Sequence, residues 1–271
     1  SSPAGLTANF GSPLYVYNES ILRQRCREMK TLVYLPCFTA CYSTKANGNP
    51  HRLRIVREEG LIADAMSPGE IALLKAAGFP KESICYVCNN VSAEELKHAA
   101  AECNHVSVDS LSQLETFGSV VQGGKVMVRV NPGLGAGHHD KVITAGKKTK
   151  FGVSPRDFTA MRSILDRYEL ELVGLNQHVG SLFMDAGAFL EAAKWLLDTA
   201  KDFPGIKIVD FGGGFGIPYK KYDGEERLPL DELSERFTAL LQSWTAEAGF
   251  DGQFIIEPGR YISAECSILL G

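Results

Sequence analysis

The sequence has no long apolar run and no surplus of basic residues. None of its apolar stretches approaches the roughly 20 residues that a membrane-spanning helix needs. Its start, SSPAGLTANFGSPLYVY, lacks an initiating Met and the basic and apolar segments of a secretory signal. Lys and Arg number 28 against 32 Asp and Glu, a formal net charge of -4, which would not attract a nucleic-acid backbone or an anionic membrane. We therefore expect a cytoplasmic protein that binds neither nucleic acid nor membrane.

The sequence also lacks a disulfide or metal framework. Its seven cysteines are an odd number, and they are scattered along a chain that is long enough to fold without disulfide bonds. Cys85 and Cys88 have CxxC spacing, but no second CxxC or His-rich pair accompanies them. We expect reduced, structural thiols and no metal site.

Internal repeats and low-complexity segments are absent, and the chain instead alternates between two patterns. With 45% hydrophobic and 22% charged residues it can build a sizeable core. Short apolar or β-branched runs, each followed by a stretch of helical period, recur along it. Strands are expected at 38–44, 61–66, 84–88, 105–109, 125–130, 171–177, 206–211 and 253–257. Helices are expected at 50–59, 68–77, 92–102, 110–119, 155–167, 185–202 and 230–247.

Eight strand–helix units with short connections predict a (β/α)8 TIM barrel over residues 34–260. An open, doubly wound sheet is the alternative. Residues 1–33 add the strand-like PLYVY and a helix at 17–32 before the barrel. The apolar run ISAECSILL follows it, with nothing in the barrel to pair it. We interpret 261–271 as the start of a truncated, β-rich C-terminal domain that PLYVY also joins; the alternative is that SILLG closes over the barrel bottom.

Unusual residues, which are charged or polar side chains and several glycines, fall at the ends of these predicted strands. Barrel enzymes build their active sites there, and phosphate groups sit in the loops after strands seven and eight. The residues in question are Lys45, Asp64, Arg129, His178, Ser181, Gly212, Gly213, Gly214, Glu257, Gly259 and Arg260. Three consecutive glycines let the backbone approach an anion and leave its amide groups exposed.

Each of these features is weak by itself, because a lone lysine such as Lys45 is commonly a solvated surface charge. Their shared placement favours a pocket for a cofactor with a phosphate and a carbonyl group. Pyridoxal phosphate would use all of them, since it binds a lysine amine covalently and needs its phosphate and pyridine nitrogen held.

Four motifs, YSTKAN, HVGS, GGGFG and EPGR, carry a family resemblance over nearly the whole chain. In this order they resemble the fold-type III pyridoxal-phosphate enzymes, the alanine racemase-like barrels that include the ornithine, diaminopimelate and arginine decarboxylases. Within that family, RVNPGLGAGHHDKVITAGKKTKFGV is most similar to the diaminopimelate decarboxylases. Ser43, Thr44 and Thr149 depart from the commoner residues without removing a functional group.

The resemblance implies roles for individual residues. Lys45 would be the covalent anchor of pyridoxal phosphate and His178 would stack on its ring, both as catalytic residues. Glu257 would face the pyridine nitrogen, and Arg260 would bind the phosphate or a substrate carboxylate. The cofactor-binding set is Lys45, Asp64, His178, Ser181, Gly213, Gly214, Glu257, Gly259 and Arg260.

The resemblance also implies an activity, the decarboxylation of meso-2,6-diaminopimelate to L-lysine in lysine biosynthesis. An acid at Glu257 keeps the pyridine nitrogen protonated, which favours decarboxylation over racemisation. The alternatives are an ornithine, arginine or carboxynorspermidine decarboxylase, a racemase, or a non-catalytic pyridoxal-phosphate carrier. In the family, a C-terminal domain supplies a cysteine and a tyrosine to the active site across a homodimer interface. We therefore expect a homodimer at full length. Because no cysteine here matches that position, we expect little activity from this chain alone.

Overall fold

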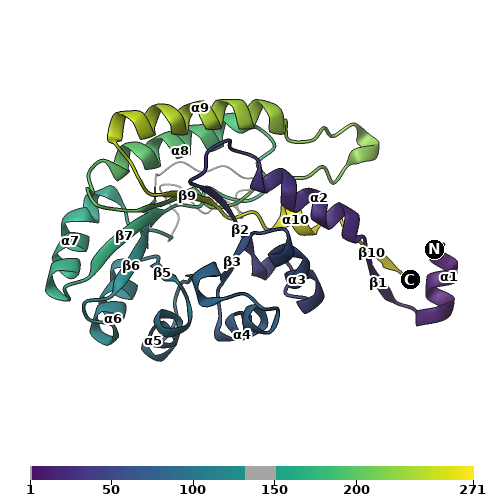
Figure 1. The fold of residues 1–271 in the computed structure, drawn as a ribbon, viewed down its shortest axis with the longest axis horizontal. Coiled ribbons are helices and arrows are strands. Elements are labelled where there is room, and N and C mark those ends of the chain that lie inside the picture. Colours follow the sequence, from purple (N-terminus) through teal and green to yellow (C-terminus); the bar gives the residue numbers. More distant parts are fainter. Residues whose placement is uncertain (1, 132–150) are drawn as a thin grey trace.

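The structure is a computed structural model that describes residues 2–131 and 151–271. Eight parallel strands close into a barrel in sequence order, with helices around the outside (Figure 1). Because β2 pairs in parallel with both β3 and β9, the barrel is closed and the open-sheet alternative is wrong. The strands are β2 (Phe38–Ser43), β3 (Ile62–Ala65), β4 (Ile84–Val87), β5 (His105–Val108), β6 (Lys125–Arg129), β7 (Glu171–Asn176), β8 (Ile208–Asp210) and β9 (Gln253–Ile256).

The helices follow the predicted ranges. They are α3 (Pro50–Glu58), α4 (Pro68–Ala76), α5 (Ala93–Glu102), α6 (Leu111–Val120), α7 (Phe158–Arg167), α8 (Ala186–Ala200) and α9 (Leu230–Ala248). Ser92 Oγ accepts from the Glu95 amide, but the Glu95 carboxylate accepts from the Tyr86 hydroxyl, so the reciprocal half of a capping box is missing. Pro155 begins a separate 3₁₀ turn, Pro155–Asp157, ahead of α7.

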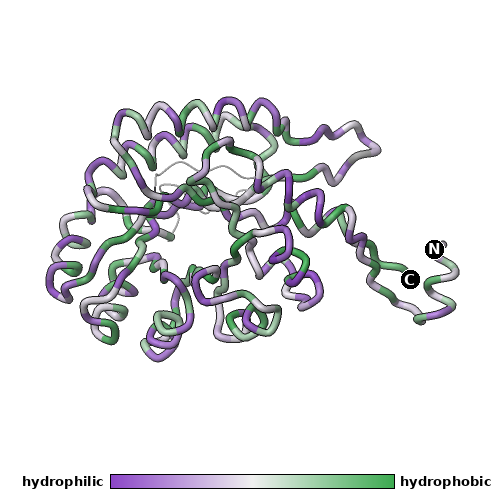
Figure 2. Tube along the Cα trace, viewed as in Figure 1, coloured by the Kyte–Doolittle hydropathy of each residue, from purple (hydrophilic) through white to green (hydrophobic). Residues whose placement is uncertain are grey.

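Alternate residues of each strand face opposite sides, and the two sides have different partners. Residues such as Tyr42 and Tyr86 belong to the large apolar core that includes the helices. Cys41, Cys85 and Ile255 form a separate small cluster. Figure 2 shows apolar residues along the barrel strands and alternating apolar and polar turns in the surrounding helices. The core therefore has two layers, one inside the barrel and one between strands and helices.

The same alternation separates the two cysteines of the CxxC sequence. Cys85 packs in the small cluster, whereas Cys88 packs in the large core. All seven cysteines lie in the described ranges and none is in a disulfide.

The two chain ends meet outside the barrel. A short helix, α1 (Pro3–Phe10), precedes β1 (Leu14–Tyr17) and α2 (Glu19–Lys30); after the barrel come α10 (Arg260–Ser263) and β10 (Ser267–Leu270). β1 and β10 form an antiparallel ribbon that projects sideways from the barrel (Figure 1). The alternative in which SILLG closes over the barrel bottom is therefore wrong. The run ISAECSILL is not one continuous strand, since it begins in α10. Along the described part of the chain, no helix is long and apolar enough to cross a membrane.

Candidate active site

The barrel interior becomes polar toward the carboxyl ends of its strands. Cys41 and Ile255 lie in the apolar interior cluster. Ser43 follows Cys41 by two residues and Glu257 follows Ile255 by two, so both lie on the same inward face, and both are buried. Asp64 and Asp210, near the ends of β3 and β8, are buried as well. Buried carboxyl groups at this end of a barrel are expensive to maintain, which indicates a functional site.

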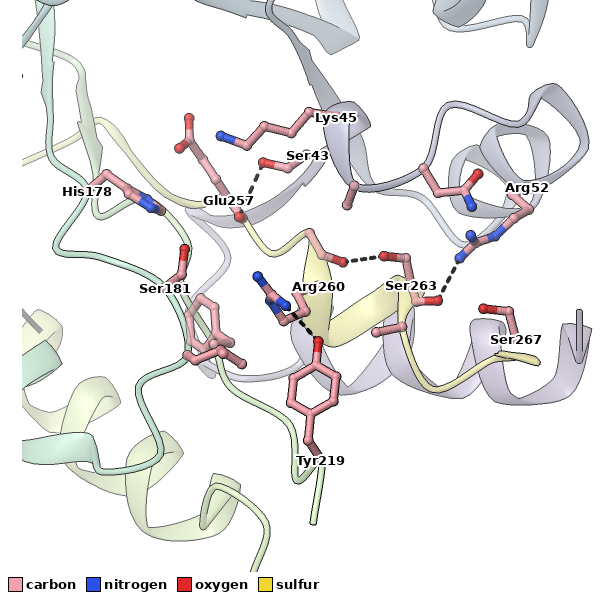
Figure 3. Close-up of a pocket in the computed structure, with 17 residues that line it drawn as sticks. Ser43, Lys45, Arg52, His178, Ser181, Tyr219, Glu257, Arg260, Ser263 and Ser267 are labelled. Carbon is pink, nitrogen blue, oxygen red and sulfur yellow. Dashed lines mark hydrogen bonds between the residues drawn. The ribbon is translucent and has the colours of Figure 1, made fainter. Parts of the chain in front are cut away.

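A cavity of about 450 Å³ opens at this polar end (Figure 3). Lys45 follows β2 on a 3₁₀ turn, Thr44–Ala46. In Figure 3 its side chain and that of Glu257 point toward one another, with His178 and Ser181 beside them. The predicted site residues that line the cavity are Lys45, His178, Ser181, Gly214, Glu257, Gly259 and Arg260. Lys45 is exposed to solvent, but within a cavity rather than on the outer surface.

Two predicted cofactor-binding residues, Asp64 and Gly213, support the cavity wall without lining it. The Asp64 carboxylate accepts a hydrogen bond of 2.7 Å from Ser43 Oγ. The Gly213 amide donates to His178 Nδ1 at 3.2 Å. Both contacts hold the strand ends and the side chains above them in place.

The glycine loop after β8 differs from expectation in how it uses its amides. The Gly212 amide donates to Asp210 Oδ1 at 2.8 Å, and the Gly213 amide is engaged by His178. The prediction that these two amides are exposed to an anion is therefore wrong, because neighbouring side chains accept their hydrogen bonds. Gly214, whose φ is +102°, does line the cavity, and a Cβ there would lie 2.1 Å from the carbonyl oxygen of Gly180. Close backbone packing therefore requires glycine at this position.

His178 is neutral, and its tautomer follows from its hydrogen bond. Because Nδ1 accepts from the Gly213 amide, the ring proton is on Nε2. Burial, with the nearby charges of Arg129 and Lys45, lowers the pKa of His178 well below its usual value. Arg129 also donates to the carbonyl oxygen of His178 at 3.4 Å. The cavity wall thus carries an uncharged imidazole fixed in one orientation.

Glu257, Asp64 and Asp210 form a buried carboxyl cluster beneath the cavity. Burial and the neighbouring Asp210 raise the pKa of Glu257 well above its ordinary value, against the opposing charge of Lys45. Burial chiefly raises the pKa of Asp210 to about 8, and burial with the charge of Glu257 raises that of Asp64. Oε1 of Glu257 is buried and has no hydrogen-bond partner among the described residues. A protonated pyridine nitrogen facing Glu257 would donate to that oxygen, so these residues fit pyridoxal phosphate.

The raised pKa of Asp210 predicts a pH dependence of folding. A carboxyl group that is protonated more readily when folded stabilises the fold fully below about pH 4 and loses that effect progressively up to about pH 8. Asp210→Asn keeps an oxygen acceptor for the Gly212 amide. The unfolding free energy of Asp210→Asn minus that of wild type should rise by about 1–3 kcal/mol from pH 5 to pH 8. Urea denaturation at each pH measures both values. The exposed Asp202→Asn is the control, and an unchanged pH slope in Asp210→Asn would contradict the prediction.

Several residues of the cavity escaped the sequence analysis. They are Ser43, Asn47, Arg52, Tyr219 and Ser263. Ser43 and Asn47 sit inside the YSTKAN motif, so their nearness to Lys45 was a usable signal. Arg52 and Tyr219 had none, because a polar residue in a helix or loop is ordinarily solvated. Arg260 begins α10 and donates to the Tyr219 hydroxyl at 2.6 Å.

The stretch compared earlier with the diaminopimelate decarboxylases lies mostly outside the described residues. Residues 132–150, Thr149 included, belong to it. Its described ends are tied to each other, since the Asn131 amide donates to the Val153 carbonyl oxygen at 3.0 Å.

Comparison with known proteins agrees with this geometry. Residues 19–264 match the model of the family described as pyridoxal-dependent decarboxylase, pyridoxal binding domain. The chain is 37% identical over 274 residues to a diaminopimelate decarboxylase of Methanothermobacter thermautotrophicus, covering 98% of this chain and 64% of that protein. It is 34% identical over 276 residues to one from Aquifex aeolicus, covering 98% of this chain and 63% of that protein.

A solved structure is similar over the same region. The crystal structure of diaminopimelate decarboxylase from Helicobacter pylori complexed with L-lysine superposes with a TM-score of 0.89 at 28% identity, covering 99% of this chain and 68% of that one. The chain therefore spans a little under two thirds of the length of the curated relatives. Since the family model covers most of its residues, the chain belongs to the pyridoxal-dependent decarboxylases, whose cofactor is pyridoxal phosphate, and contains their pyridoxal-binding domain.

Proposed function

We propose that the whole protein decarboxylates meso-2,6-diaminopimelate to L-lysine with pyridoxal phosphate as its cofactor. The observation that carries this proposal is that the Lys45 amine and the buried Glu257 carboxyl group point toward one another in one cavity at the strand ends (Figure 3). A primary amine and a proton-holding acid are the two groups that this cofactor needs from a protein. The similarity to diaminopimelate decarboxylases supports the choice of substrate.

Pyridoxal phosphate, when bound, supplies a sink for the electron pair left by the departing CO2. Lys45 Nζ would hold its carbonyl carbon, and Glu257 would hold a proton against its pyridine nitrogen. The raised pKa of Glu257 suits a group that keeps this proton near neutral pH. Asp210, next to it, disfavours a second negative charge and so helps to retain the proton.

The remaining residues would bind and orient. Neutral His178, fixed by the Gly213 amide, would present its ring to the cofactor without adding charge. Ser181 and Gly214 would hold the phosphate, with a hydroxyl and a close backbone approach. Arg260, held by Tyr219, would bind a carboxylate or the phosphate.

The test is product analysis with the full-length protein loaded with pyridoxal phosphate. Incubation with meso-diaminopimelate should release CO2 and L-lysine in equal amounts, whereas ornithine and arginine should give at least about 100-fold less product per unit time. Putrescine as the main product would assign an ornithine decarboxylase, and an epimer without CO2 would assign a racemase. Absence of any turnover would leave a pyridoxal-phosphate carrier.

We also propose that the full-length protein is a cytoplasmic homodimer in which residues 261–271 lead into a second, β-rich domain. Tyr15, Ile268 and Leu269 on the projecting ribbon are each more than half exposed, which supports their burial by further protein. The seven cysteines, none of them in a disulfide, support a reducing compartment.

A further inference from the structure

Arg52 is a buried arginine at the end of the cavity remote from Lys45. It extends from α3 toward Ser263 (Figure 3), lines the cavity, and is only 3% exposed. Its Nη2 donates to the Ser263 carbonyl oxygen at 3.2 Å and to Cys266 Sγ at 3.1 Å. The guanidinium carbon lies 4.9 Å from the centroid of the Tyr17 ring. The side chain is thus held on several sides by neutral groups.

No anion in the described part of the chain balances this charge. None of the ion pairs found there includes Arg52, whereas the exposed Arg27 of α2 pairs with Glu59. Its Nε and Nη1 atoms are buried and have no hydrogen-bond partner among the described residues. A buried guanidinium that uses one of its three nitrogens is costly unless an anion completes it. Two adjacent N–H groups of a guanidinium match the two oxygens of a carboxylate.

We propose that Arg52 is a specificity-determining residue that binds the carboxylate which the substrate keeps. This inference rests on the proposed function. Diaminopimelate has a carboxylate at each end; one leaves as CO2 at the Lys45 end, and the other remains in L-lysine. Arg52 and Lys45 line the same cavity, so one molecule of this class can reach both. The neighbouring Ser263 and Ser267 add polar groups at the Arg52 end.

The test compares two diamines that differ only in this carboxylate, L-lysine and cadaverine. Full-length protein loaded with pyridoxal phosphate is titrated with each ligand by calorimetry. Wild type should bind L-lysine more tightly than cadaverine. Arg52→Met should weaken L-lysine binding by about 10- to 100-fold and change cadaverine binding by less than about 3-fold. Arg52→Gln, which keeps a donor for the Ser263 carbonyl oxygen, should show the same selective loss and decides the question if Arg52→Met does not fold.

Arg54→Met, an exposed arginine on the same helix, is the matched control and should leave both affinities unchanged. An equal loss for L-lysine and cadaverine in both Arg52 variants would overturn the assignment, because it would show that Arg52 only supports the fold. The proposed function would survive that result. If wild type takes up pyridoxal phosphate but binds neither diamine, the proposed function itself fails, and the role of Arg52 fails with it.

Discussion

Lys45→Ala should abolish the absorbance band that wild type gains when pyridoxal phosphate is added. The Lys45 amine lies in the cavity with Glu257, and among the described residues that line the cavity it is the one primary amine. Without it the cofactor can bind only through its phosphate and ring, and no covalent link to the protein forms. Decarboxylase activity of the full-length variant should fall by about 1,000-fold or more.

The measurements are an absorbance titration with pyridoxal phosphate and a CO2-release assay. Lys97→Ala is the control. It removes an exposed lysine of α5 that does not line the cavity, and it should behave as wild type. Identical spectra for wild type and Lys45→Ala would show that another amine holds the cofactor. An unchanged melting temperature of the apo variant would show that the band and the activity are lost because the amine is missing and not because the fold is destabilised. We expect this result because Lys45 is exposed and contributes little to packing.

Gly213→Ala should destabilise the fold by about 3 kcal/mol and prevent cofactor binding. An added Cβ would lie 2.1 Å from the Glu257 carbonyl oxygen and 3.1 Å from its carbonyl carbon, both backbone atoms. Relief requires the loop after β8 to move away from the end of β9. That movement would also break the hydrogen bond from the Gly213 amide to His178 Nδ1.

Urea denaturation and the pyridoxal-phosphate absorbance titration measure the two effects separately. Gly69→Ala is the matched control: its Cβ would come no closer than 3.8 Å to Ser67 Oγ, and it lies in α4, so it should be neutral or slightly stabilising. If Gly213→Ala unfolds within about 0.5 kcal/mol of wild type, the close approach of the two loops is not a constraint in solution.

The barrel was predictable because its signals are local. Each strand is a short apolar run and each helix has its own period. Several helices also have a capping side chain, such as Ser110, which accepts from the Gln113 amide. A parallel pair of strands requires a crossover connection, so eight strand–helix units leave few possible topologies. Lys45, His178 and Glu257 came together because each follows a strand, and all parallel strands end on the same face of the barrel.

The ribbon of β1 and β10 shows where local signals stop. The two apolar runs were visible in the sequence, but their pairing joins residues such as Tyr15 and Leu269 from opposite ends of the chain. Long-range pairing leaves no mark in either segment. The short helix α10 was likewise missed, since four residues carry too little periodicity to be distinguished from a strand.

The sequence by itself determined the barrel, the place of the site at its strand ends and the type of cofactor, because these depend on residue types and their order along the chain. Only the tertiary structure decided which glycine amides are engaged and how the carboxyl groups of Glu257 and Asp210 share a buried space. It also showed that Arg52 faces the cavity with no anionic partner in residues 2–131 and 151–271. Those properties depend on distances between residues far apart in sequence. Hydrogen bonds, burial and charge coupling act through space, and the closed barrel sets that space.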